Sequence, residues 1–214
     1  MSISKIPSAG FQDNVKFRNL IINGSMDIAQ RGTSQASAGT GYNTVDRWRL
    51  TKSITASFDM TQSTDVPSGQ GFANSLKMDC TTANGSPSAS NSFIFNQRIE
   101  DQNCIYLKKG TSNAESTTVS FWVKSNKTGT YICELFDSHN SRHINKSYTV
   151  SSSNTWEKKT ITFAGDTSGA FANDNGIGLM LQFWLVAGSD YSSGTLQTSW
   201  GSSTNANRAV GQVN

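Results

Sequence analysis

The stretch GIGLMLQFWLVAG, from Gly176 to Gly188, is the longest apolar run in the chain. It is too short for a membrane-spanning helix, which takes about 20 apolar residues. Every second residue from Ile177 to Leu185 is apolar, which is typical of a β-strand with a buried face. The opposite face is also largely apolar, so we expect the strand to be covered on both faces, by a loop, by the N-terminal segment or by another subunit. The apolar residues of that opposite face are Met180, Trp184 and Val186.

The segments that precede this strand alternate apolar and polar residues. In ITASFDMTQS, residues 54–63, the apolar side chains fall on one face and the polar ones on the other. No window of helical length has apolar residues three and four apart, and only residues 100–111 read as a short helix. The pattern predicts an all-β fold, an antiparallel β-sandwich of the jelly-roll kind with at most one short helix. Further strands are expected in NSLKMDCTT, NSFIFNQRIE, TTVSFWVKS, GTYICELFD, KSYTVSS and TWEKKTITFAG.

The composition restricts the class of protein. Of 214 residues, 35% are hydrophobic, which is enough for a sizeable core. The net charge is only +3, and the basic residues form no run longer than the pairs 108–109 and 158–159, so nucleic-acid binding is not expected. The first residues hold no apolar stretch of signal-peptide length, and no membrane insertion is expected.

Three cysteines occur, an odd number without the spacing of a metal site. We interpret Cys80, Cys104 and Cys133 as free thiols, while a bridge between Cys80 and Cys104 stays open. Cys133 lies in YICELF, where a small buried residue fits.

The chain divides into three parts. Residues 1–18 are expected to form an N-terminal arm, residues 19–200 the β-sandwich and residues 201–214 a polar C-terminal tail. The segment FRNLIINGSMDIAQRG is read as strand, Asn-Gly turn, strand. We expect the tail from Asn205 onward to be mobile or held by a partner, because it has scarcely any core residue.

Several motifs together resemble a family of tailed-phage virion proteins. They are NLIING (19–24), QRGT (30–33) and DRW (46–48), followed by NQRIE, TTVSFWVKS, TWEKKTITFAG and NGIGLMLQFWLVAG. The resemblance spans Asn19 to about Trp200 and implies a tail-fibre or appendage protein with a carbohydrate-binding-module-like jelly roll, often a homotrimer. The family's closing strand, Gly-Val-Gln-Leu-Glu-x-Gly, has no match here. We therefore expect that the sequence stops short of its natural end or that another chain supplies this strand.

The two clusters near the start of the chain are interpreted as a structural latch. Gly24 and Gly32 suit tight turns with positive φ. The arginines can fork onto a carboxylate or onto free carbonyl groups, the aspartate can accept backbone amides, and the tryptophan can fill the core. A catalytic Arg/Asp site would need a nucleophile or a substrate pocket, and nothing nearby indicates one. The latch residues are Gln30, Arg31, Asp46, Arg47 and Trp48.

Candidate glycan-binding residues are aromatic or polar side chains in loop-like sequence. Sugar rings pack on aromatic faces, so Trp200 and Tyr191, the latter beside Asp190, are the first candidates, although each could instead be a core or subunit-contact residue. In DSHNSRH, the residues His139, Arg142 and His143 could bind sugar hydroxyl groups from an exposed hairpin tip. Asp137 with the two histidines could alternatively bind a metal ion, but a solvated loop is the preferred interpretation and no metal is predicted.

No motif of a hydrolase or a nucleotide-binding enzyme occurs. The chain lacks Gly-x-Ser-x-Gly, a phosphate-binding Gly loop and His-Glu-x-x-His, and no carboxylate pair has the spacing of a glycosidase. We predict a non-enzymatic virion protein without cofactors, which attaches to host surface glycan or to other virion proteins. The alternatives are a capsid-decorating or head-fibre protein and, less favoured, a glycan depolymerase domain.

Overall fold

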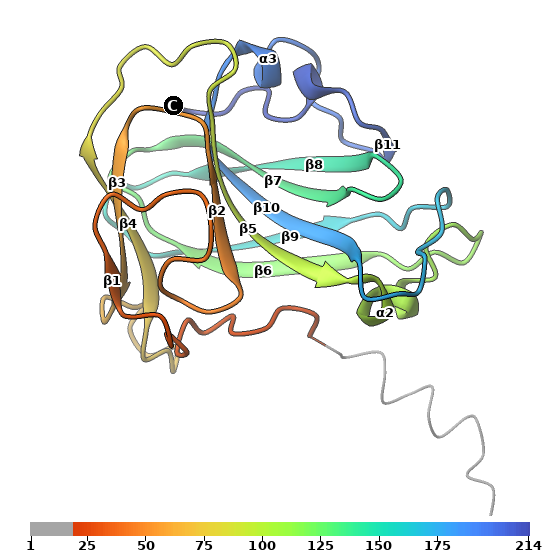
Figure 1. Ribbon diagram of the computed structural model, residues 1–214, viewed down its shortest axis with the longest axis horizontal. Helices are drawn as coiled ribbons and strands as arrows, with labels where there is room; N and C mark the ends of the chain where they lie inside the picture. Colours follow the sequence, from red (N-terminus) through yellow and green to blue (C-terminus); the bar gives the residue numbers. More distant parts are fainter. Residues whose placement is uncertain (1–18) are drawn as a thin grey trace, which may run out of the picture.

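The computed structural model describes residues 19–214, so the predicted N-terminal arm, residues 1–18, lies outside the described residues. The fold class is confirmed: the chain is an antiparallel β-sandwich, in which every strand pairing of the described residues is antiparallel. Figure 1 shows the strands stacked in layers, with the C-terminal segment over one of them.

One layer is a six-stranded sheet with the order β11-β8-β7-β10-β5-β2. Its longest strand, β10, corresponds to the apolar run of residues 176–188. It lies between β5 and β7 in the middle of the sheet. The strands are β2 (Trp48–Lys52), β5 (Ser92–Glu100), β7 (Gly129–Asp137), β8 (Arg142–Val150), β10 (Ile177–Ala187) and β11 (Gly201–Ser202).

The other layer consists of two smaller sheets. One consists of the two strands β6 and β9, and the other has the order β1-β3-β4. The strands are β6 (Thr117–Val123), β9 (Glu157–Phe163), β1 (Ser34–Gln35), β3 (Ser57–Ser63) and β4 (Ser75–Thr82).

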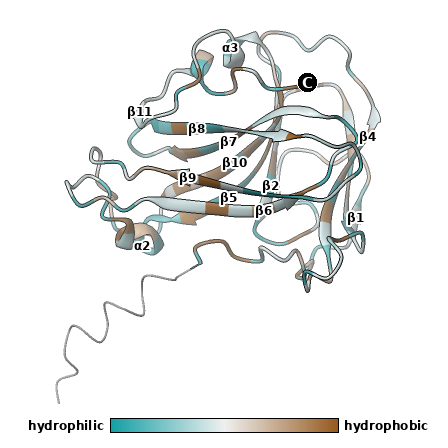
Figure 2. Cartoon of the chain, turned by 180° about the vertical axis from the view of Figure 1, so that it is seen from behind, coloured by the Kyte–Doolittle hydropathy of each residue, from teal (hydrophilic) through white to brown (hydrophobic). Residues whose placement is uncertain are grey.

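Two hydrophobic clusters join the layers. The larger one packs β6 and β9 against the inner face of the six-stranded sheet, and the smaller one packs β3 and β4 against the same face near β2. Both contain partly buried Leu76 and Phe95, so the two halves of the core are continuous. Figure 2 shows hydrophobic segments on β5 and β10 of the six-stranded sheet and on β9 of the other layer.

The outer face of β10 is covered by the chain itself. Trp184 is fully buried there, in a third cluster with Ile94, Ile132, Ala187 and Ala209. The C-terminal segment, residues 189–214, supplies Ala209 and lies over this face of the sheet (Figure 1). The prediction of a strand covered on both faces is therefore confirmed, and the cover is a segment that follows the strand in sequence. The placement of Val186 on the same face as Trp184 is wrong, because the register shifts between the two residues and Val186 packs in the inner cluster with Phe93.

The expectation that the tail from Asn205 onward is mobile or held by a partner is wrong. The Val213 amide donates to the Thr130 carbonyl at 2.8 Å. The Asn214 side chain accepts from the Ala187 amide at 2.8 Å and donates to the Ala187 carbonyl at 2.9 Å. The segment is anchored by hydrogen bonds to β7 and β10 and has few apolar side chains. The low apolar content of its sequence therefore does not reveal that it is fixed.

Helix is confined to short turns in the described part of the chain. The predicted helix at residues 100–111 is present as α2 (Asp101–Cys104) followed by the 3-10 turn η1 (Ile105–Leu107). Two further turns, α3 (Ser189–Ser192) and η2 (Asn205–Asn207), belong to the C-terminal segment. No helix in residues 19–214 has the length and apolar character to span a membrane. All three cysteines are free thiols, as predicted, and Cys133 is buried.

The predicted hairpin around Asn23 and Gly24 is wrong. Residues 22–25 form a turn, but no strand flanks it in the described residues. The positive φ falls on Asn23, at 55°, while Gly32 has a φ of 123° as expected. The segment instead runs along the sandwich edge, where the buried Gln97 side chain donates to the Ile22 carbonyl and accepts from its amide, both at 2.8 Å.

Candidate functional site

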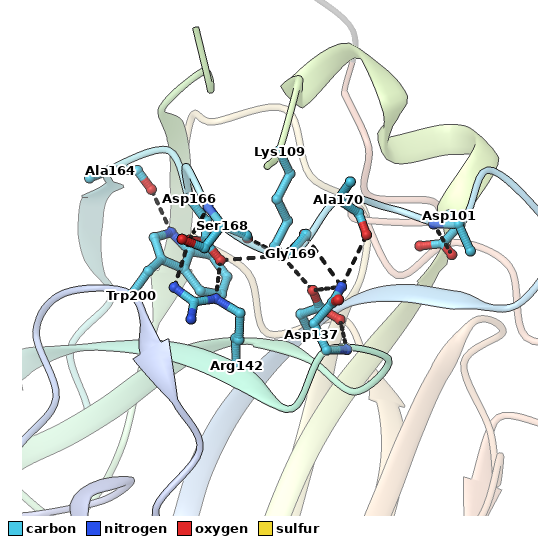
Figure 3. Close-up of polar contacts among 12 residues, drawn as sticks. Asp101, Lys109, Asp137, Arg142, Ala164, Asp166, Ser168, Gly169, Ala170 and Trp200 are labelled. Atoms are coloured by element: carbon cyan, nitrogen blue, oxygen red, sulfur yellow. Dashed lines mark hydrogen bonds and ion pairs between the residues drawn. The ribbon is translucent and has the colours of Figure 1, made fainter. Parts of the chain in front are cut away.

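The loops at one end of the sandwich meet around a buried lysine (Figure 3). The Lys109 side chain is 4% exposed, and its ammonium group lies 2.6 Å from Asp137 and 3.2 Å from Asp166. It also donates to the carbonyl groups of Ser168, at 3.0 Å, and Gly169. This one group therefore ties together the turn after η1, the end of β7 and the loop that precedes β10.

Asp166 is held by two cations. The Arg142 guanidinium donates Nε to Oδ2 at 2.7 Å and Nη2 to Oδ1 at 2.8 Å, which is a bidentate pair. Burial alone would raise the pKa of the Asp166 carboxyl, but the hydrogen bonds from Arg142 and the Ser168 amide, with the charge of Lys109, lower it below the usual value. The lowered pKa favours the anionic form of Asp166, which fixes the loop.

Trp200 and Arg142, two of the predicted glycan-binding residues, come together at this cluster. The Trp200 indole Nε1 donates to the Ala164 carbonyl at 2.7 Å, and its ring lies 5.8 Å from the Lys109 ammonium (Figure 3). The cavity that Trp200 and Lys109 help to line is about 20 Å³, room for about one water molecule. This cavity is too small for a sugar ring, and Lys109, Arg142, Asp166 and the Trp200 indole already have hydrogen-bond or salt-bridge partners, so the contacts of this cluster are those of a structural clasp.

His139 and His143 lie apart. His139 is exposed in the turn between β7 and β8, whereas the His143 side chain is fully buried. The expectation that His143 belongs to an exposed tip is wrong, because β8 begins at Arg142 and His143 already pairs with Phe136 inside the ladder.

His143 belongs to a buried polar network on the outer face of the sheet. Its Nδ1 lies 3.0 Å from Glu134 Oε1, and the Trp184 indole donates to Glu134 Oε2 at 2.8 Å. Arg208 of the C-terminal segment forms a bidentate pair with Glu134, at 2.9 and 3.0 Å. Burial would raise the pKa of Glu134, but the charge of Arg208 and the hydrogen bond from His143 lower it. The network pins the C-terminal segment to the sheet.

A metal site at Asp137, His139 and His143 does not form. Asp137 is occupied by Lys109 and by the Asn140 amide, and His143 faces Glu134. Within residues 19–214, no group of three or more His, Cys, Asp or Glu side chains is arranged to hold a metal ion.

Tyr191 and Asp190 lie in α3, away from the clasp. Asp190 is exposed. The Tyr191 ring packs on Trp184, with centroids 5.2 Å apart, and belongs to the cluster under the C-terminal segment. Tyr191 therefore serves mainly to cover Trp184.

The residues interpreted as a latch make the following contacts. Asp46 accepts the Gln30 amide at 3.1 Å and the Arg31 guanidinium at 2.5 Å. Trp48 donates its indole N–H to the Asn23 carbonyl at 3.0 Å and stacks on Phe95 at 4.6 Å. These contacts hold residues 23–31 on the edge of the sheet at β2. Arg47 reaches Glu100, with Nη2 2.9 Å from Oε1.

Beside Arg47 lies a groove that the sequence does not reveal. We call it the Tyr42 groove; it has a volume of about 220 Å³ and opens on the outer side of β2, β5 and the start of β10. Tyr42 lies at the rim of the groove and is 41% exposed. The Arg31 guanidinium lies 5.6 Å from the centroid of its ring. Its lining residues are Tyr42, Arg47, Arg98, Ile99, Glu100, Asn175, Gly176 and Ile177.

The acidic group of the groove is neutralised. Burial would raise the pKa of the Glu100 carboxyl, but the hydrogen bond from Arg47, with help from the Asn103 amide, lowers it below the usual value. Glu100 is therefore an anion that orients Arg47 and is poorly suited to donate a proton.

No protein-family model and no curated protein matches the chain. Two solved structures are similar over 77% of it, each at 16% sequence identity. One is the enzymatically active domain of tailspike protein 4 of bacteriophage CBA120, with a TM-score of 0.43, of which this chain spans 19%. The other is a CBM4 structure, with a TM-score of 0.38, of which it spans 88%. Superpositions this loose assign no function.

Proposed function

We propose that this chain is a non-enzymatic phage virion protein, a module of a tail fibre or another appendage, whose β-sandwich attaches to glycan on the host surface. The virion setting rests on the sequence motifs from Asn19 to Trp200 that resemble such proteins. Glycan binding rests on one observation, the Tyr42 groove, in which an exposed aromatic ring stands beside guanidinium and carboxylate groups on a rigid sheet.

The geometry of this groove suits one sugar unit of a longer chain. A tyrosine ring offers an apolar face for a sugar ring, while charged side chains around it bind hydroxyl groups. Its volume of about 220 Å³ is below the roughly 300–1,000 Å³ typical of pockets for drug-sized ligands. Arg98 and Glu100 lie in β5 and Arg47 directly precedes β2, so the polar groups are held in place before binding.

The absence of catalysis is part of the same proposal. A glycosidase needs one carboxyl group with a raised pKa as general acid. Glu100 in the groove has a lowered pKa, and Asp137 and Asp166 are bound to Lys109 and Arg142. These acidic groups are already engaged as structural anions. Asp101, whose pKa is raised mainly by burial, is 1% exposed and is not among the residues that line the groove.

Incubation of the purified protein with host envelope polysaccharide tests both the proposed glycan binding and the proposed absence of catalysis. We expect the protein to co-sediment with the polysaccharide and to release no reducing sugar. The variant Tyr42→Ala should lose binding by about tenfold or more, while Tyr106→Ala, which removes another exposed tyrosine outside the groove, should not. Release of sugar would show a depolymerase, and equal binding by both variants would remove the groove from the proposal.

Location in the particle separates this proposal from a capsid-decorating protein. Antibody labelling of intact virions should mark the tail or its appendages, and labelling of the head would favour the capsid alternative. Homotrimeric assembly, which the sequence resemblance implies, also belongs to this proposal, and sedimentation equilibrium of the purified chain distinguishes three copies from one.

A further inference from the structure

The Tyr42 groove holds more positive charge than its own carboxylates neutralise. Arg31 is paired with Asp46, and Arg47 with Glu100. Arg49 and Arg98, which lie on the same side of the sheet, form no salt bridge with any carboxylate in residues 19–214. The groove and its rim therefore carry two surplus guanidinium groups.

The register of β2 and β5 brings these two arginines close together. Arg49 pairs with Asn96, and Arg98 lies two residues further along β5, so both side chains point to the same face as diagonal neighbours. Burial and the repulsion by the nearby charge of Arg98 lower the pKa of Arg49. Arg49 donates to the Thr51 hydroxyl at 2.6 Å, a neutral acceptor.

Arg98 also has an unused donor. Its Nε is buried and has no hydrogen-bond acceptor, although nearly all buried polar atoms in proteins have one. Arg98 lines the groove, and Glu100, the carboxylate among the lining residues, is paired with Arg47. The remaining nearby carboxylate, Asp174, accepts the Gly176 amide at 2.7 Å and so is bound within its own loop.

Resting on the glycan-binding function proposed above, we infer that the Tyr42 groove binds an acidic sugar whose carboxylate pairs with Arg98 and is attracted by Arg49. A carboxylate accepts two parallel hydrogen bonds from one guanidinium, and in the described residues the Arg98 side chain forms no salt bridge that competes for it. The sugar ring then packs on Tyr42 at the rim. The ligand class is a uronic-acid or sialic-acid unit of a host polysaccharide.

Matched pairs of oligosaccharides that differ only in the charged group test this inference. Suitable pairs are trigalacturonate with its methyl ester and sialyllactose with lactose, measured by titration calorimetry at low and high salt. We expect at least one acid to bind about tenfold or more tightly than its neutral partner, with affinity that falls as salt is raised.

Variants locate the binding. Arg98→Gln should reduce the affinity for the acid about tenfold or more and leave the neutral partner unchanged, and Arg49→Gln should act in the same direction. Lys77→Gln removes an exposed positive charge on β4, outside the groove, and is the matched control. Thermal unfolding of each variant checks that it folds. If the Arg98→Gln variant does not fold, the Arg49→Gln variant tests the inference by itself.

Two results would overturn the inference and are distinguishable from a failure of the proposed function. Equal affinity for acid and neutral partners, or equal loss in Lys77→Gln and Arg98→Gln, would leave glycan binding in place and remove the acidic-sugar specificity. Absence of binding to any acidic or neutral glycan, host polysaccharide included, would overturn both.

Discussion

The side chains that hold the loops together are charged residues placed where water cannot reach them. Lys109 is buried between Asp137 and Asp166, and Glu134 is buried under Arg208. Breaking such a pair is destabilising chiefly because the remaining charge is left buried and unpaired. These contacts therefore predict large effects for single substitutions.

Lys109→Met should lower the free energy of unfolding by about 3–5 kcal/mol, because two buried carboxylates lose their shared cation. The adjacent Lys108→Met is the control, since Lys108 is 54% exposed and pairs with exposed Glu115, and an exposed pair contributes about 0–1 kcal/mol. Urea unfolding of both variants measures the difference. Equal effects would contradict the structural role assigned to Lys109.

Acid should destabilise the protein. The pKa values of Glu134 and Asp166 are lowered in the folded state, so the folded chain binds fewer protons than the unfolded chain. Their contribution is fully present above the unfolded pKa values, about 4, and is lost as pH falls through the folded values. Buried Asp101, whose pKa is raised mainly by burial, acts in the opposite direction.

The urea midpoint is therefore expected to fall steadily as pH is lowered from about 5 to about 2. A midpoint that stays constant or rises over this range would contradict the assignment of Glu134 and Asp166 as paired anions.

Residues close together in sequence were predictable, and residues joined only by strand register were not. Asp46 contacts Gln30 and Arg31, which precede it by 16 and 15 residues in a turn-rich segment, so the sequence indicates these contacts. The Tyr42 groove needs Arg98 beside β2, and this follows from the pairing of β2 with β5. A hint was present: Arg47 and Arg49 alternate around Trp48, as residues on the outer face of a strand do.

At the scale of elements, alternation located most strands. The segments that became β3 to β10 each carry a period of two or a continuous apolar run. Short strands with little apolar content escaped prediction, among them β1 and β11, which have two residues each. The 3-10 turn η2 and α3 escaped as well, because one helical turn is too short to show a period.

The C-terminal segment should behave as an integral element of the sandwich. The Ala209 amide donates to the Tyr191 carbonyl at 2.8 Å and the Val213 amide to the Thr130 carbonyl at 2.8 Å. We expect both amides to be protected from hydrogen exchange in the purified protein.

Arg208→Ala should abolish that protection, because it leaves Glu134 buried without its cation. The control is Lys158→Ala, which changes an exposed residue of β9 and should leave exchange at Ala209 and Val213 unchanged. Rapid exchange of these amides in the unmodified protein would show that the segment does not dock.

At the scale of the whole molecule, the two small sheets and the C-terminal segment all pack on one six-stranded sheet. Because Leu76 and Phe95 belong to both inner clusters, neither half of the core can open alone without exposing the other. We expect a single cooperative unfolding transition, with coincident curves from far-UV circular dichroism and tryptophan fluorescence. Separate transitions would indicate that the β1-β3-β4 sheet unfolds independently.

The most direct test of the account is to observe where a glycan contacts the folded protein. In a titration followed by amide NMR with the acidic oligosaccharide that binds most tightly, the largest shifts should fall on Tyr42, Arg47, Arg98 and Gly176, around the groove. Shifts confined to Trp200 and Arg142 at the clasp, or to Tyr191 in α3, would contradict the assignment of the Tyr42 groove as the binding site.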